Sequence, residues 1–388
     1  MNYHISDTEG CQILYFTTCS CLNEDRGVVW IGGGEENPNI FWTDFKTGEK
    51  HQISDNHEGV MKSYVYFNGF VNRGICKSSI SFDNIHEKVY YLQGRDICCA
   101  DLDGNIRVLN QIPEDQVTAF THISRDGKRF CIPTTDMRAL EYPREEGQPF
   151  DFWKGYDIDR RCRDEDLSSY LRVYDTETGE EILCEKVPKC WITHVSFNPV
   201  NPEIIMYNNE WCEFAGLRRM WLWDGKNHIA IRSMEDGRTL HDWVCHEMWS
   251  MDGNYVYYHG GFANDGPKFL GRYSLADKSI VEVPFDKHYT GYGHFNNSSR
   301  GLFVCDGYYE HPDYNSEDYN GRWISFQKVD WDKKTITWYP MEVHDSQMNH
   351  QDNHPHPTFN PEGTRAYYTS TRSGKREIYS VAVPEELL

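Results

Sequence analysis

One short segment combines residue types that could bind a metal ion: Gln351-Asp-Asn-His354-Pro-His356-Pro. Its two prolines favour an extended backbone and exclude a helix. Because side chains at i and i+2 of an extended chain point to the same face, His354 and His356 are expected to converge. Gln351 can add a neutral oxygen if the chain bends before His354, and two imidazoles with an amide oxygen suit a borderline-hard divalent ion. The alternative interpretation is a His-Pro turn on a surface loop.

One of these histidines belongs to a series that recurs along the chain. A histidine stands seven residues before a turn glycine or asparagine in four successive segments, at His194, His246, His294 and His356. In a propeller the strand that follows this position lines the central channel, so equivalent positions are expected to face inward at one mouth. A lone histidine at the start of a strand is more often structural. Four at one offset favour a functional site.

The elements that must position these histidines are short strands. Tyr, Trp and Phe fall in bursts flanked by Gly, Asn and Asp, which is typical of strands and turns rather than of long amphipathic helices. One unit of strand, Asn-Pro or Asp-Gly turn, strand and hairpin recurs about seven times at a period of roughly 40–60 residues, which is the range of propeller blades. We therefore predict an all-β, seven-bladed β-propeller of four-stranded antiparallel blades. Two β-sandwiches would not produce a single repeat along the whole chain.

The ends and the insertions complete the predicted organisation. The segment Tyr3–Ser6 is expected to form the outermost strand of the last blade and so to close the propeller. Residues 1–388 are predicted to be a single domain. Residues 138–169 and 307–322 do not fit the repeat, and we interpret them as loop insertions on one face, where functional loops are common.

Composition restricts the partners and the compartment. A net charge of −21 argues against nucleic acid, and an anionic ligand would need a locally positive site or a bound metal. No apolar run approaches the length of a membrane span, and the start of the sequence has no signal-peptide pattern. Thirteen cysteines without a Cys-x-x-Cys pair indicate mostly reduced thiols in a cytoplasmic protein. Sequence leaves a homo-oligomer open.

A site built from His294, Gln351, His354 and His356 would leave coordination positions for a substrate. Mixed nitrogen and oxygen ligands without thiolate favour Mn²⁺ or another divalent cation over a structural zinc ion. The two other histidines of the series, His246 and His194, would remain for acid–base or binding work. Arg218 and Arg219, just before a predicted strand, could add positive charge, although a surface pair is the alternative. The sequence lacks a Gly-x-Ser-x-Gly elbow and a glycine-rich phosphate loop.

With these residues in place, the chain resembles the oligogalacturonate lyases, polysaccharide lyase family twenty-two, over nearly its whole length. The motifs that carry the resemblance are Ile13–Thr17, Arg219–Leu222, Cys245–Glu247, Gly293–His294 with Asp306–Gly307, and above all Gln351-x-x-His354-Pro-His356-Pro-x-Phe359. The resemblance implies a seven-bladed propeller with Mn²⁺ on His294, Gln351, His354 and His356. It also implies that His246 is the catalytic base and Arg219 its charge-stabilising partner. Residues 207–211 lack the His-Glu-Gly-Pro pattern of the family, so substrate contacts can differ.

The reaction that the resemblance implies agrees with these residue types. β-Elimination removes the proton next to a uronate carboxylate, which requires the carboxylate charge to be neutralised and a neutral imidazole to accept the proton. We expect an oligogalacturonide lyase of pectin breakdown that releases unsaturated monomers from short oligouronides, with His194 and Arg218 binding substrate. Two alternatives stay open: a non-catalytic propeller that binds partners, and a metal-dependent propeller enzyme acting on another uronide. Lactonases favour carboxylate and amide ligands around Ca²⁺, which the histidine-rich set argues against.

Overall fold

The structure of the chain is a computed structural model that describes residues 3–34, 36–57, 59, 74–75, 77–139, 157–210, 218–232, 238–285, 293–307, 322–349 and 351–388. Its strands form seven antiparallel sheets that follow one another along the chain. They are the blades of a seven-bladed β-propeller, so the predicted all-β fold class is confirmed. Among the described residues no helix is both long and apolar enough to span a bilayer.

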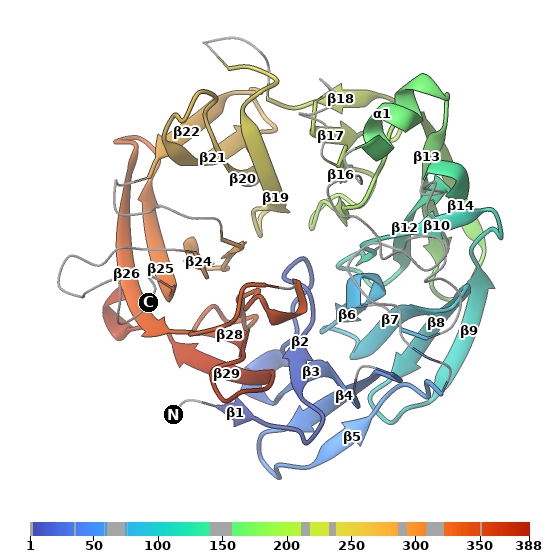
Figure 1. Cartoon of the computed structure of the whole chain (residues 1–388), viewed down its shortest axis with the longest axis vertical. Helices are drawn as coiled ribbons and strands as arrows, with labels where there is room; N and C mark the ends of the chain where they lie inside the picture. Colours follow the sequence, from blue (N-terminus) through green and yellow to red (C-terminus); the bar gives the residue numbers. More distant parts are fainter. Residues whose placement is uncertain are drawn as a thin grey trace. The chain divides into compact units, whose positions relative to one another are not determined.

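The chain divides into two compact units. The first comprises residues 1–55, 101–105 and 244–388, and the second comprises residues 56–100 and 106–243. The prediction of one domain over residues 1–388 stays a prediction. Figure 1 traces the strands of both units.

Four blades lie wholly or almost wholly in the first unit. Blade 1 consists of β2 (Cys11–Ile13), β3 (Gly27–Gly32), β4 (Asn39–Asp44) and β5 (Lys50–Gln52). Blade 5 consists of β19 (Trp243–Trp249), β20 (Tyr255–Gly261), β21 (Lys268–Ser274) and β22 (Ile280–Pro284). Blade 6 consists of β23 (Phe295–Asn297), β24 (Leu302–Cys305), β25 (Trp323–Asp330) and β26 (Thr335–Val343). Blade 7 consists of β27 (Thr358–Phe359), β28 (Arg365–Ser370), β29 (Glu377–Ala382) and β1 (His4–Ile5).

The N-terminal strand completes blade 7, as predicted. Strand β1 pairs with β29, with His4 opposite Tyr379 and Ile5 opposite Ile378 (Figure 1). Beside this pairing, one apolar core joins the last blade to the first, since it contains Ile5, Trp30, Phe41 and Tyr367 together. Burial of these large side chains stabilises the junction between the two ends of the chain.

The other three blades lie in the second unit, apart from Asp101 of blade 2. Blade 2 consists of β6 (Ser81–Asp83), β7 (Lys88–Gln93), β8 (Asp96–Asp101) and β9 (Ile106–Gln111). Blade 3 consists of β10 (Gln116–Thr118), β11 (His122–Ile123), β12 (Arg129–Asp136), β13 (Ser168–Asp175) and β14 (Glu181–Pro188). Blade 4 consists of β15 (Val195–Phe197), β16 (Ile205–Asn208), β17 (Met220–Trp223) and β18 (His228–Ala230). Blade 3 has a fifth strand because β10 and β11 both pair with β12.

The turn used to align the repeat is present in the blades of the first unit. Gly253, Gly301 and Gly363 have φ values of 71°, 75° and 66°, a region that favours glycine. Each donates its N–H to the carbonyl three residues earlier, at 2.9, 3.2 and 2.9 Å. Because the three blades share this turn, the residue seven positions before its glycine occupies an equivalent position in each blade, and in all three blades that residue is a histidine.

Within the described residues the helices are few and short. They are α1 (Asp157–Asp164) and the 3-10 turns η1 (Asn23–Asp25), η2 (Lys77–Ser79), η3 (Met137–Ala139), η5 (Gln351–Asn353) and η6 (Glu385–Leu387). Helix α1 lies in the predicted insertion 138–169, so that segment is not wholly a loop. Residues 140–156 of this insertion, and 308–321 of the insertion 307–322, lie outside the described residues.

Candidate metal centre and neighbouring histidines

The first unit brings three of the predicted ligands together. His294, His354 and His356 each offer a nitrogen, and these nitrogens lie within 4.8 Å of one another. The ring of His294 lies 4.2 Å from that of His356 and 5.2 Å from that of His354, measured between centroids. His294 and His356 are buried, at 0% and 1% exposure. Three converging imidazoles with little solvent form a site that a divalent cation can fill.

The carboxylate of Asp306, which follows β24, organises this group. Its oxygens accept the His294 backbone N–H at 2.6 Å, the His294 Nδ1–H at 3.0 Å and the His356 backbone N–H at 3.2 Å. With Nδ1 of His294 donating to Asp306, Nε2 is the nitrogen that can bind a metal, an arrangement common around metal-bound histidines. Burial raises the pKa of Asp306, but the charge and hydrogen bonds of His294, together with His344, outweigh burial and lower this pKa to about 2.

The backbone conformation of residues 351–356 differs from the predicted extended strand. Residues 351–353 form the 3-10 turn η5, and His356 has a φ of 48°. His354 and His356 therefore converge through a turn and a left-handed residue rather than through strand alternation. His354 donates from Nε2 to the Met348 carbonyl at 3.3 Å, which leaves Nδ1 for a ligand role. The side-chain oxygen of Gln351 is buried and has no hydrogen-bond partner among the described residues.

His246 lies beside this group, but not where the sequence placed it. It was expected just ahead of a strand, and it lies inside β19 with a φ of 55°. Its ring centroid is 4.6 Å from that of His294. Its Nδ1 lies 3.1 Å from the Gly293 carbonyl and 2.6 Å from Nε2 of His259. Because a carbonyl can only accept, we assign the proton of the neutral His246 ring to Nδ1, which leaves the lone pair on Nε2.

Two aromatic residues and one glycine complete this part of the first unit. Phe16, which follows β2, lies 5.1 Å from the His246 ring and 5.5 Å from the His294 ring. Tyr15 lies 4.8 Å from the His356 ring. Gly293 must be glycine because a Cβ there would lie 2.7 Å from the Gly307 backbone and from Cys305 Sγ. Sequence reasoning gave these residues no role, since only the fold shows which rings they contact.

The other three predicted residues, Arg219, Arg218 and His194, belong to the second unit. Arg219 directly precedes β17, as expected, and its guanidinium is buried against Glu210 at 3.3 Å. Glu210 also accepts hydrogen bonds from Thr193 at 2.5 Å and Asn208 at 2.7 Å. Sequence reasoning assigned no role to Glu210, because nothing in the sequence pairs it with Arg219. Arg219 is therefore a buried, ion-paired cation rather than half of a surface pair.

Arg218 and His194 have less distinctive surroundings. The Arg218 carbonyl accepts a hydrogen bond from the Trp221 indole at 2.8 Å, and its side chain is partly exposed. His194 precedes β15 and packs edge-on against Phe120, with ring centroids 4.5 Å apart. The roles predicted for both residues in substrate binding stay predictions.

The fold and the imidazole group define a class: an all-β propeller with a site suited to a divalent cation. Within that class the family is clear. The sequence profile of the oligogalacturonate lyase family matches residues 8–387, and the chain belongs to this family. The predicted family and enzyme class, a lyase rather than a non-catalytic interaction module, are thereby confirmed.

Individual relatives agree with this assignment. The chain is 25% identical to the oligogalacturonate lyase of Dickeya dadantii (strain 3937) and 24% identical to the oligogalacturonide lyase of Pectobacterium atrosepticum, in each case over 97% of this chain and 91% of the relative. Among solved structures, an oligogalacturonate lyase in complex with manganese has a TM-score of 0.74 at 19% identity, covering 100% of this chain and 97% of the other. The oligogalacturonate lyase of Vibrio parahaemolyticus has a TM-score of 0.75 at 18% identity, covering 100% and 98%. At these identities the structures support the shared fold.

Proposed function

We propose that this protein cleaves short oligogalacturonates by β-elimination and uses a divalent cation, Mn²⁺ or a similar ion, bound by His294, Gln351, His354 and His356. Family membership supports the reaction, and the manganese complex of a similarly folded oligogalacturonate lyase supports the metal. One observation carries the proposal: the buried His246 ring lies 4.6 Å from His294, so a base is held next to a cation site.

The donor set fits such an ion. Three imidazole nitrogens and one amide oxygen are neutral ligands of intermediate hardness, and no thiolate belongs to the set. The Asp306 carboxylate supplies negative charge behind His294, to which it is hydrogen-bonded. Because it accepts the Nδ1–H of His294, it leaves Nε2 as the nitrogen for the cation. The buried amide oxygen of Gln351 gains a partner when a cation binds. When bound, the cation neutralises the uronate carboxylate and stabilises negative charge on the adjacent carbon.

His246 is the residue to which we assign proton transfer. With Nδ1 donating to Gly293, the Nε2 lone pair can accept the proton from the carbon next to the carboxylate. The electron pair of that C–H bond forms a new carbon–carbon double bond, and the glycosidic C–O bond breaks. The departing oxygen takes a proton from solvent or from an acid group. The products are an unsaturated uronate and a shortened sugar.

We assign Arg219 to stabilisation of the developing charge, with Arg218 and His194 as substrate contacts. Arg219 keeps a fixed direction because it is buried against Glu210.

The eleven cysteines of the described residues are all free thiols, which supports the proposed cytoplasmic location.

Ultraviolet absorbance tests the proposal directly. Purified protein is incubated with digalacturonate, with added Mn²⁺ or after chelation. We expect absorbance from unsaturated product with the metal and its loss, reversible by Mn²⁺, after chelation. Product formation that is unaffected by thorough removal of metal would overturn the metal-dependent mechanism.

A further inference from the structure

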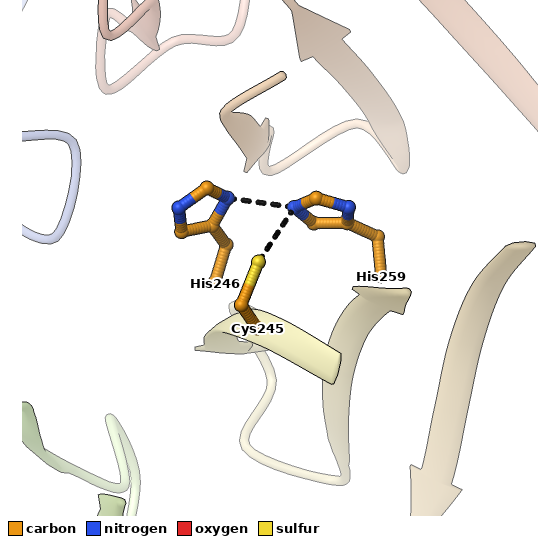
Figure 2. A group of neighbouring side chains, drawn as sticks. All are labelled: Cys245, His246 and His259. Carbon is orange, nitrogen blue, oxygen red and sulfur yellow. Dashed lines mark hydrogen bonds between the residues drawn. The ribbon is translucent and has the colours of Figure 1, made fainter. Parts of the chain in front are cut away.

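A second group of potential metal ligands includes His246 itself. The side chains of Cys245, His246 and His259 come from β19 and β20 and point toward one another (Figure 2). Cys245 Sγ lies 3.3 Å and His246 Nδ1 lies 2.6 Å from Nε2 of His259. All three residues are buried, at 6%, 3% and 1% exposure. One thiol and two imidazoles thus meet around one small volume.

Local backbone geometry produces this convergence. Neighbouring residues of a regular strand point to opposite faces, so Cys245 and His246 should point apart. The φ of 55° at His246 breaks this alternation and turns its ring toward the same partner as Cys245. A non-glycine residue with a left-handed φ is strained, and such residues concentrate at functional sites.

We propose that Cys245, His246 and His259 form a second cation site, selective for soft ions such as Zn²⁺ and distinct from the site of His294, His354 and His356. Thiolate with two imidazoles is a ligand set that binds zinc, and it disfavours the harder Mn²⁺. The thiol proton leaves to solvent when the cation binds. Tetrahedral zinc would place the two nitrogens about 3.4 Å apart and the sulfur about 3.6 Å from each nitrogen. The two nitrogens must therefore separate by about 0.8 Å from their present 2.6 Å, within reach of small side-chain rotations.

Binding at this site would act on the proposed reaction, and this consequence rests on the proposed role of His246. A cation on Nδ1 uses the lone pair of that nitrogen, so the single proton of the neutral ring moves to Nε2. Nε2 then donates instead of accepting and cannot take a proton from substrate. A soft cation would switch the lyase off, whereas the hydrogen bond from Nδ1 to Gly293 keeps it active.

The first experiment is independent of lyase activity. Protein preloaded with excess Mn²⁺ is titrated with Cd²⁺, and the near-ultraviolet sulfur-to-metal charge-transfer absorption is recorded. We expect a saturable band of one equivalent that is lost in Cys245→Ser and weakened at least tenfold in affinity in His259→Asn. The band should survive in Cys184→Ser, which removes an exposed thiol, and in His354→Ala, which alters the other site. A band that persists in Cys245→Ser, or no band in the wild-type protein, would overturn the second site.

The second experiment tests the consequence for catalysis. Lyase rates are measured against rising Zn²⁺ at a large excess of Mn²⁺, and each variant is compared with its own zinc-free rate. We expect Cys245→Ser to need at least tenfold more Zn²⁺ for half inhibition than the wild-type protein. If Zn²⁺ inhibits Cys245→Ser and the wild-type protein at the same concentration, the inhibition comes from replacement of Mn²⁺ at the other site. That result would refute the switch. If the cadmium band follows the expectation and the protein has no lyase activity, the proposed function fails and the second site stands.

Discussion

Asp306→Asn isolates the contribution of the buried carboxylate to the metal centre. The carboxylate accepts three N–H donors, two from His294 and one from His356, and it is fully buried. An asparagine keeps one oxygen but presents an NH₂ group in place of the other, so at least one N–H faces a donor. It also removes the negative charge next to the cation ligands.

The size of the effect follows from these contacts. Loss of a partner behind a metal-bound histidine costs about 10–100-fold in metal affinity, or roughly 1.4–2.7 kcal/mol. A buried donor left without an acceptor costs a similar amount, about 1–3 kcal/mol. We therefore expect Mn²⁺ to bind about 10–100-fold more weakly to Asp306→Asn, with a lower free energy of unfolding in the absence of metal.

Calorimetric titration with Mn²⁺ measures the affinity, and denaturant unfolding of the metal-free protein measures the stability. Asp330→Asn is the matched control, because Asp330 pairs with Lys333 at the surface. Its Mn²⁺ affinity should equal that of the wild-type protein. If Asp306→Asn folds and binds Mn²⁺ with unchanged affinity, Asp306 does not support the ligands and the reasoning is wrong.

Three further predictions follow from other contacts. His354→Ala should bind far less than the expected one Mn²⁺ ion per chain, as measured by elemental analysis. A variant that retains about one ion per chain would exclude His354 as a ligand. Initial rates should be higher on di- and trigalacturonate than on polygalacturonate, since a chain of charge −21 repels a long polyanion; faster cleavage of the polymer would contradict this. Burial raises the pKa of Glu377, but hydrogen bonds from Ser6, Tyr379 and His4 lower it to about 2, below the unfolded value of about 4.3. This carboxylate therefore stabilises the fold above about pH 4.3, and its contribution is lost as pH falls toward 2. Glu377→Gln should lower the free energy of unfolding by about 1–3 kcal/mol at pH 7. In denaturant unfolding, the stability of this variant should also depend less on acid pH than that of the wild-type protein. An unchanged acid dependence would argue against the role of Glu377.

Much of this architecture could be predicted because the repeat is local. Each blade reuses one turn, and in three blades of the first unit its glycine has a positive φ, so counting back from the turn reaches the same place in each blade. The closing role of the N-terminal strand also followed from pattern, because the last blade lacked one strand in sequence. This counting identified His294 and His356, whereas His354 joins them through the η5 turn.

What the sequence could not show depends on contacts between distant residues and on backbone exceptions. Positive φ values at His246 and His356 are set by the surrounding blades, and neither residue type requires them. Asp306 lies 50 residues before His356 and hydrogen-bonds its backbone, which no spacing rule predicts. Phe16 contacts His246 and His294 across more than two hundred residues of sequence. Glu210 is recognisable as the partner of Arg219 only in the folded blade.

The central claim is that His246 takes the substrate proton next to a cation site. Its most direct test is the rate of ultraviolet product formation from digalacturonate by Mn²⁺-loaded wild-type protein and by Mn²⁺-loaded His246→Asn. Asparagine tolerates the positive φ at this position but offers no basic nitrogen. We predict that His246→Asn binds Mn²⁺ like the wild-type protein and loses at least a hundredfold in rate. A variant that retains both its metal and the wild-type rate would contradict the account.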